Sequence, residues 1–279
     1  MDFLRKDGVS AQEDEKNIVS YRAHKVFLPT FNKSTQNVKQ KMKKFIVTQA
    51  AAALMLLIIA TTGCKKNVNP NDPNNGNESN DNLEYVDLGL PSGTLWANYN
   101  IGATVPEGYG NYYSWAEIEK KETYKWDTYK YCNESGNQLT KYCNDPEFGN
   151  EGFSDNLTIL ESGDDVAIAL LGNEWCMPTK EQWDELLQNT TYSWTTQNDV
   201  NGYLFTATNG NTMFLPASDR IRDDEVLDLG NQGYYWSNML DNENPRKANT
   251  LVFSSEDIKT SSSFRHLGIP VRPVRAAVQ

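Results

Sequence analysis

The residues that could carry out chemistry in this chain are few, and their spacing argues against a catalytic centre. His266 is the one histidine after residue 63, so any Ser/His/Asp or Cys/His set would depend on it alone. The carboxylate pairs Asp164–Asp165 and Asp184–Glu185 are sequence neighbours whose side chains point apart, which suits helix caps and solvated faces better than acid–base work. We therefore expect no enzyme activity. The sequence has no C-x-x-C pair, which disfavours a zinc site, and we expect no cofactor.

The chain has four cysteines, and two of them share a short repeat. Cys132 and Cys143 each lie in the sequence KYCN, on either side of a turn that contains Gly136. A hairpin around that turn can bring them together as a disulfide, and two free buried thiols fit the spacing equally well. Cys176 is most simply a small residue of the core.

The stretch of residues 172–187, GNEWCMPTKEQWDELL, is the strongest local structural signal near these residues. Thr179 and Gln182 have the spacing of a capping box, in which each side chain satisfies a free amide at the start of a helix. Trp183 and Leu186 then fall on one helical face, away from the acidic residues. The stretch therefore predicts an amphipathic helix that packs on a core.

The remaining elements are expected to be mainly short strands. Asn209 and Gly210 can take the positive φ values of a tight turn, and β-branched and aromatic residues flank them, which predicts a hairpin over residues 203–216. Other elements are expected as a hairpin at 85–97, strands at 234–239, 250–254 and 270–274, and a helix at 164–171. Residues 117–153 lack a clear period, so irregular structure with local hairpins is expected there. The expected combination of a few helices with many short strands favours an α+β fold.

Charge divides the chain into two parts. The formal net charge is −11, yet residues 1–63 carry ten Lys and Arg against five Asp and Glu, so the remainder is near −16. Such a surface repels phosphate backbones and has no basic stripe with interleaved aromatic residues, which argues against a nucleic-acid partner. Seven Trp and fourteen Tyr favour a compact β-rich core or an aromatic recognition surface.

The basic N-terminal part contains a targeting pattern. Residues 42–63 contain lysines, then an apolar run, and then small residues directly before Cys64, which is the layout of a secretory signal. The segment is similar to a bacterial lipoprotein signal peptide with Cys64 as the acylated residue, although Thr61 stands where an aliphatic residue is usual. Met42 is then the expected start and residues 1–41 an over-extended N-terminus. A single uncleaved membrane anchor is the alternative.

The chain beyond this signal divides by composition. Residues 64–82, rich in Asn, Pro, Asp and Gly, are expected to form a flexible tether. Residues 83–275 are expected to form the folded domain, and residues 276–279 a short tail. A lipid anchor places the domain at an outer-membrane surface, facing either the periplasm or the exterior.

Eight motifs occur in order along the expected domain. They are YVDLGLPSGTLWA at 85–97, YYSWAE at 112–117, KYCN at 141–144, DDVA at 164–167, GNEWCMPTKEQWDELL at 172–187, NGYLFTATNGNTMFLPAS at 201–218, GYYWS at 233–237 and GIPVRPVR at 268–275. Together they resemble the Fibrobacter succinogenes major paralogous domain family of secreted and lipid-anchored Bacteroidetes-type proteins. The resemblance implies an α+β, C-type-lectin-like fold, related to formylglycine-generating enzymes, with a twisted antiparallel sheet, short helices and long irregular loops. Cys176 stands where the pattern usually has arginine.

The segment 236–265 alternates Asn, Ser, Asp and aromatic residues, a composition that suits ligand recognition by loops. We therefore expect a non-catalytic adhesion or binding module for a glycan or protein ligand. The expected ligand contacts are Tyr235, Trp236, Asn238, Asp241, Asn244, Phe264 and His266.

Three alternatives remain open from the sequence. Glu243, Asn244 and Pro245 have the residue types of a calcium-dependent sugar site, although lectin motifs place the proline between the two ligands. The second alternative is an enzyme of the formylglycine-generating type. The resemblance implies that such an enzyme has a pair of cysteines in its C-terminal half, and no cysteine follows Cys176 here. A tip or stalk component of a surface appendage or glycan-capture complex would differ from the binding module only in its partner.

Overall fold

The computed structural model describes residues 83–276. The predicted signal segment, Cys64 and the tether lie outside these residues. The helices within the described range are α2 (Val166–Leu171), α3 (Lys180–Asn189) and the 3-10 turns η1 (Trp126–Thr128), η2 (Asn150–Gly152) and η3 (Ser162–Asp164). The strands are β1 (Tyr85–Asp87), β2 (Thr94–Ala97), β3 (Tyr112–Tyr113), β4 (Thr190–Gln197), β5 (Val200–Ala207), β6 (Thr212–Pro216), β7 (Ile221–Arg222), β8 (Glu225–Val226), β9 (Gln232–Leu240), β10 (Lys247–Ser254), β11 (Ile258–Phe264), β12 (Ile269–Pro270) and β13 (Val274–Ala276).

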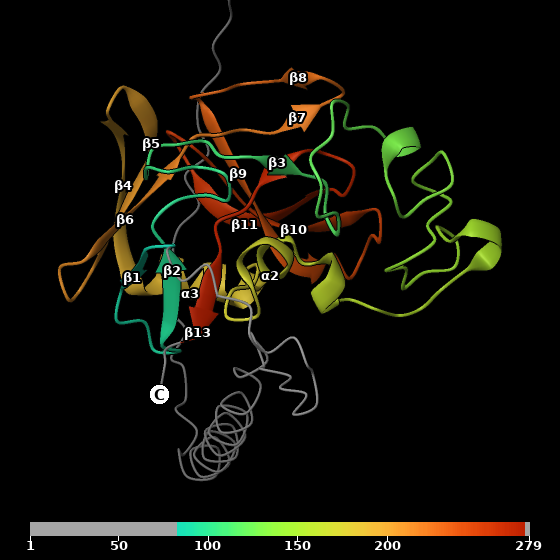
Figure 1. Cartoon of the computed structure of the whole chain (residues 1–279), viewed down its shortest axis with the longest axis horizontal. Helices are drawn as coiled ribbons and strands as arrows, with labels where there is room; N and C mark the ends of the chain where they lie inside the picture. The colour runs from blue at the N-terminus through green and yellow to red at the C-terminus, as the bar shows by residue number, and fades with distance from the viewer. Residues whose placement is uncertain (1–82, 277–279) are drawn as a thin grey trace, which may run out of the picture. The chain divides into compact units, whose positions relative to one another are not determined.

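These strands pair as several small antiparallel sheets (Figure 1). The sheet orders are β1-β2-β13, β11-β10-β9, β12-β3, β4-β5-β6 and β7-β8. The described residues are therefore mostly β, and the expectation of an α+β, C-type-lectin-like domain is wrong. The physical reason is strand length and pairing: strands run from two residues in β3 to nine in β9, and the short ones form separate ladders instead of extending one twisted sheet.

The predicted helix start at α3 is confirmed. Thr179 Oγ1 accepts the N–H of Gln182 at 3.1 Å, and Gln182 Oε1 accepts the N–H of Thr179 at 2.9 Å. A cap of this kind stabilises a helix by about 1 kcal/mol. The predicted apolar face is also confirmed, because Trp183 and Leu186 are fully buried and the Trp183 ring lies 4.5 Å from that of Trp96.

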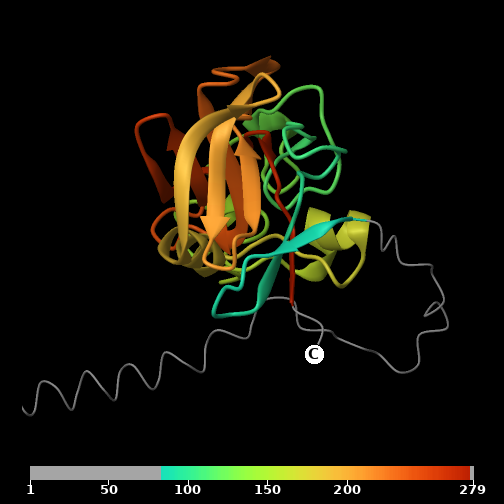
Figure 2. The same cartoon turned by 90° about the vertical axis from the view of Figure 1, so that its left-hand side faces the viewer.

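The predicted hairpin over 203–216 is formed by β5 and β6, which Figure 2 shows beside β4 in one curved sheet. Gly210 has a φ of 86°, the conformation that favours glycine, while Asn209 does not take a positive φ. The loop closes through a hydrogen bond of 2.9 Å from the N–H of Ala207 to the carbonyl of Asn211. The turn is therefore a three-residue loop that needs only one residue with positive φ.

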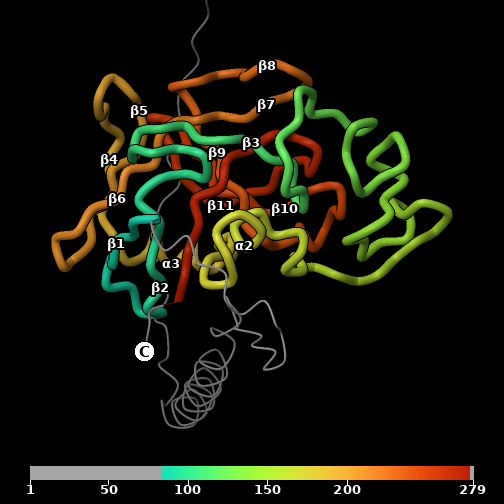
Figure 3. The backbone as a smooth tube through the Cα atoms, in the orientation of Figure 1, coloured from blue at the N-terminus to red at the C-terminus, as the bar shows by residue number. Residues whose placement is uncertain are grey.

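The expectation of irregular structure over residues 117–153 is confirmed. The segment contains η1, η2 and an isolated bridge between Cys132 and Leu139, and Figure 3 shows it as successive loops. The predicted helix at 164–171 is shorter than expected, since Asp165 caps α2 by accepting the N–H groups of Ala167 and Ile168. None of the described helices has the length and apolar character needed to span a bilayer.

Candidate functional site

One end of the β11-β10-β9 sheet brings cations beside an exposed aromatic ring. Where β10 begins and β11 ends, Lys247 lies opposite Phe264 in the strand register. The N–H of Arg265 donates to the carbonyl of Arg246 at 3.0 Å, so the same ladder continues past the strand end. We call the residues that meet here the Arg246 platform, and they are Asn137, Phe148, Asn244, Arg246, Lys247 and Phe264.

Arg246 lies at the centre of this platform. Its Nε donates to Asn244 Oδ1 at 3.1 Å, and its Nη1 donates to Asn137 Oδ1 at 3.3 Å. The guanidinium carbon lies 4.7 Å from the ring centre of Phe148 and 6.0 Å from that of Phe264. Planar guanidinium groups contact aromatic faces in this way and keep their remaining donors for an oxyanion. Among the described residues, Nη2 of Arg246 has no hydrogen-bond acceptor.

Among residues 83–276, no carboxylate forms an ion pair with the cations of the platform. Lys247 Nζ lies 5.4 Å from the ring centre of Phe264. Within the described part of the chain, neither Arg246 nor Lys247 forms an ion pair. The carboxylate nearest to Arg246 in the sequence is that of Glu243, which is exposed to solvent. Two adjacent cations therefore have no carboxylate partner within residues 83–276, although the net charge of the chain is −11.

A buried arginine keeps the platform assembled. Arg265 is fully buried, and its guanidinium donates at 2.9 Å to the hydroxyl of Tyr129 and to three carbonyls, those of Lys141, Tyr142 and Pro245. A buried charge is tolerated where hydrogen bonds satisfy it in this way. Most of these partners belong to the irregular segment and Pro245 to the turn before β10. One side chain thus fastens the irregular segment to the sheet.

Trp126 and His266 complete the aromatic packing next to Phe264. The Trp126 ring centre lies 6.2 Å from that of Phe264 and 4.5 Å from that of His266. Burial, with the positive charges of Lys121 and Arg222, lowers the pKa of His266 to about 4. Its Nδ1 is buried and has no hydrogen-bond partner in the described part of the chain. A neutral, half-buried imidazole packs beside the Phe264 ring and is poorly matched to proton transfer near neutral pH.

Two of the predicted ligand contacts are core residues, which corrects the prediction. Tyr235 and Trp236 are both 0% exposed and cannot reach a ligand. Strand alternation alone would expose one of them, but β9 has a hydrophobic cluster on each face, so consecutive side chains are both covered. Asn238 is also buried, and its N–H donates to the carbonyl of Pro178 at 2.9 Å.

Asp241, another predicted contact, lines a polar groove beside the platform. The groove has a volume of about 350 Å³ and is lined by Lys180, Glu181, Met239, Asp241, Asn242, Glu243, Asn249, Ser261 and Ser262. Asp241 Oδ1 accepts the N–H of Glu243 at 2.9 Å and the N–H of Asn244 at 3.3 Å. This carboxylate therefore shapes the turn that leads from the groove to the platform. The volume is within the range of small-ligand sites.

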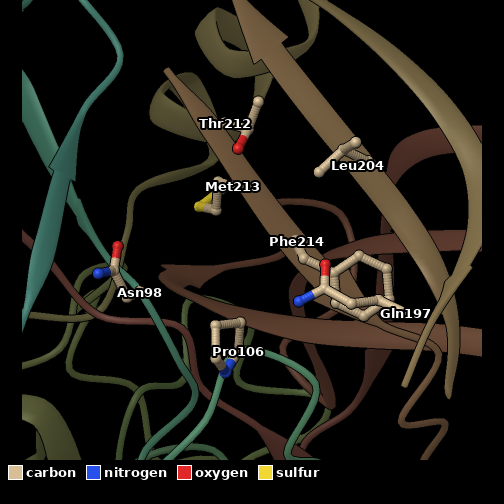
Figure 4. Close-up of a pocket in the computed structure, with 7 residues that line it drawn as sticks. All are labelled: Asn98, Pro106, Gln197, Leu204, Thr212, Met213 and Phe214. Carbon is tan, nitrogen blue, oxygen red and sulfur yellow. The ribbon is translucent and has the colours of Figure 1, made fainter. Parts of the chain in front are cut away.

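A second cavity, shown in Figure 4, is smaller. It has a volume of about 180 Å³ and is lined by Asn98, Pro106, Gln197, Leu204, Thr212, Met213 and Phe214. Ligand pockets usually enclose roughly 300–1,000 Å³. None of the lining residues is charged, so we assign it to imperfect packing of the loop after β2 against β5 and β6.

The remaining sequence candidates do not form a reactive centre. Cys132 and Cys143 are free thiols, whose sulfurs donate to the carbonyls of Trp126 and Asp145 at 2.9 and 3.0 Å. The structure therefore has the free-thiol alternative and not the disulfide. Burial raises the pKa of Cys132 to about 11, which disfavours the reactive thiolate.

The adjacent carboxylates Asp164 and Asp165 are both buried and have separate partners. Burial alone would raise the pKa of Asp164, but hydrogen bonds from Lys141, Tyr131 and Tyr142 outweigh it and the pKa is lowered. Burial raises the pKa of Asp165 to about 6, although its oxygens accept three backbone N–H groups. Both carboxylates serve local structure.

At the residues considered for calcium, the side-chain oxygen of Asn244 is engaged by a neighbouring arginine. Asn244 Oδ1, an oxygen that such a site would need, accepts two hydrogen bonds from Arg246, each of 3.1 Å. No group of three or more His, Cys, Asp or Glu side chains is placed to hold a metal ion within the described range.

Sequence reasoning identified Asn244 and Phe264 but missed the cations between them. The signal that could have found Arg246 and Lys247 is their adjacency in a strongly acidic chain, directly after the Asn-rich turn. Comparison of the chain with family models, curated proteins and solved structures gives no match. The platform combines hydrogen-bond donors, positive charge and an apolar ring at one end of a sheet, and such groups can hold a ligand.

Proposed function

We propose that this protein is a non-catalytic binding module of the cell envelope that recognises its ligand at the Arg246 platform. The observation that carries the proposal is an exposed aromatic ring beside two cations that have no carboxylate partner among the described residues. Binding sites commonly combine such an aromatic anchor with a few fixed polar groups. The ladder between β10 and β11 and the hydrogen bonds of Arg265 preorganise these groups, which lowers the entropic cost of binding.

The anchoring part of the proposal rests on the sequence. An acyl group on Cys64 and a tether over residues 64–82 would hold the domain at an outer-membrane surface and let it stand away from the bilayer. The eight ordered motifs support a relation to the Fibrobacter succinogenes major paralogous domain family. Labelling with an alkyne fatty acid tests the anchor, since Cys64→Ala should lose the label. Label that persists in this variant would contradict the lipoprotein proposal.

Ligand binding is tested with the full chain in mild detergent, on a glycan array and in protein pull-downs, with and without calcium. Phe264→Ala should weaken saturable binding at least about tenfold, because it removes the aromatic anchor. Tyr192→Ala is the matched control, since Tyr192 is 41% exposed against 38% for Phe264 and lies in a different sheet. Melting curves establish that both variants fold.

Two outcomes would reject the proposed site. One is equal loss of binding in both variants, which would mean that the effect is not local to the platform. The other is unchanged binding in a folded Phe264→Ala variant, which would place recognition elsewhere, with the groove around Asp241 as the next surface to test.

A further inference from the structure

We propose that the ligand of the Arg246 platform is an anionic saccharide, held by its carboxylate or sulfate at Arg246 and Lys247 and by the apolar face of its ring at Phe264. The inference rests on the proposed function and narrows it to one class of ligand. Neither the motifs nor the resemblance assigns this chemistry.

The charge of the platform selects an anion. Arg246 is held by the amide oxygens of Asn244 and Asn137, which orient the guanidinium without neutralising it. Its Nη2 makes no hydrogen bond to the described residues, and a guanidinium with N–H groups to spare can pair with a carboxylate or a sulfate. Lys247 adds a second positive charge, with its Nζ 5.4 Å from the ring centre of Phe264. Elsewhere in the described chain, comparable cations such as Lys180 pair with a carboxylate at 2.6 Å.

The ring of Phe264 selects a saccharide among anions. It remains 38% exposed although Trp126 packs against it in an edge arrangement, with ring centres 6.2 Å apart. A pyranose has one face of C–H groups that packs on an aromatic surface, and its hydroxyls bond to polar groups at the rim. Both cations lie within 6.0 Å of the ring centre, so one sugar ring can cover the phenyl group while its acidic substituent reaches a cation.

The main competitor is an acidic peptide, which would use the charges and have less need of the ring. A long nucleic acid is disfavoured, because the rest of the chain is strongly acidic and repels an extended polyanion. A saccharide with spaced charges meets the two cations with less of this repulsion. The distinction between saccharide and peptide is therefore the point to test.

The full chain in mild detergent is titrated with four probes. These are oligogalacturonate, its full methyl ester, a sulfated dextran oligosaccharide, and polyglutamate. The ester keeps the sugar rings and removes the charge, and polyglutamate keeps carboxylates and removes the rings. We expect saturable binding of at least one anionic saccharide, at least about tenfold tighter than binding of the ester or polyglutamate, and weaker as salt increases. The two anionic saccharides distinguish a carboxylate site from a sulfate site.

Substitutions locate the binding. Arg246→Gln and Lys247→Gln should each weaken the preferred probe about tenfold or more, and Arg246→Lys should fall between, since it keeps charge and loses the paired donors. Lys259→Gln is the control, because Lys259 lies opposite Val252, at the far end of the same strand pair. If Arg246→Gln fails to fold, Lys247→Gln carries the test, since its ammonium makes no ion pair within residues 83–276.

Several results would overturn the inference. Equal affinity for oligogalacturonate and its ester would show that the site does not recognise the charge of the ligand. Equal affinity for polyglutamate and the anionic saccharides would identify a peptide site. Failure of both anionic saccharides to bind, or unchanged affinity in folded Lys247→Gln and Arg246→Gln, would also refute it. A neutral glycan whose binding is lost in Phe264→Ala would refute the anionic ligand and leave the proposed binding function standing.

Discussion

Arg272 offers the sharpest test of how this domain is held together. It is fully buried, and its guanidinium donates to four oxygens: Asn100 Oδ1 at 2.9 Å and the carbonyls of Ala97 at 3.1 Å, Asn98 at 2.7 Å and Phe214 at 3.0 Å. Arg272→Met would remove the donor from these four acceptors. Each acceptor that water does not reach should lower the free energy of unfolding by about 1–3 kcal/mol. Burial lowers the pKa of Arg272 to about 10, because the charged guanidinium loses its hydration. Removing this buried charge offsets part of the loss of hydrogen bonds. We therefore expect a net loss of about 3–5 kcal/mol.

The assay is urea unfolding of the full chain in mild detergent at pH 7, followed by tryptophan fluorescence. Arg222→Met is the matched control, since Arg222 is exposed, and its change should stay within about 0.5 kcal/mol. The loss of unfolding free energy in Arg272→Lys should lie between those of Arg222→Met and Arg272→Met, because one ammonium reaches fewer of the four oxygens. A loss below about 1 kcal/mol for Arg272→Met would refute the reasoning, because it would mean that the acceptors find other donors at little cost.

Three further predictions concern the interior. Because burial raises the pKa of Asp165 from 3.8 to about 6, its contribution to stability is fully present below about pH 4 and is lost as pH rises through 6. Asp165→Ala should therefore cost more at pH 4 than at pH 7 in urea unfolding, and the reverse order would contradict the shift. Gly233→Ala would place a methyl group 2.0 Å from the ring of Phe253, so it should lower the unfolding free energy by about 1–3 kcal/mol, and Phe253→Leu should relieve most of that loss. Peptide mapping without reductant should recover Cys132 and Cys143 unlinked, and a peptide that joins them would show that the free-thiol arrangement is wrong.

Local signals in the sequence predicted local structure well. The capping box of Thr179 and Gln182 and the turn at Gly210 were found because each depends on contacts among residues a few positions apart. The same reasoning failed at Tyr235 and Trp236. Their burial depends on what covers each face of β9, and those covering residues come from distant parts of the chain. Periodicity reports one apolar face and cannot report that both faces are covered.

The candidate site also combines residues that the sequence indicated with contacts that it did not. The sequence indicated that Asn244 and Phe264 belong to a recognition segment, because their types and surroundings are typical of loops that bind ligands. It did not indicate that the Arg246 side chain contacts Phe264 and also Phe148, which is far away in the chain. That contact depends on Arg265 and its hydrogen bonds to the irregular segment.

The sequence by itself determined the acidic charge, the start of α3, the β5–β6 hairpin and the irregular character of residues 117–153. Each of these follows from composition or from interactions over a few residues. Only the tertiary structure decided the mostly β architecture, the burial of consecutive aromatic residues in β9 and the assembly of the Arg246 platform. These depend on long-range pairing, in which the free energy of a contact is set by residues that sequence spacing does not bring together.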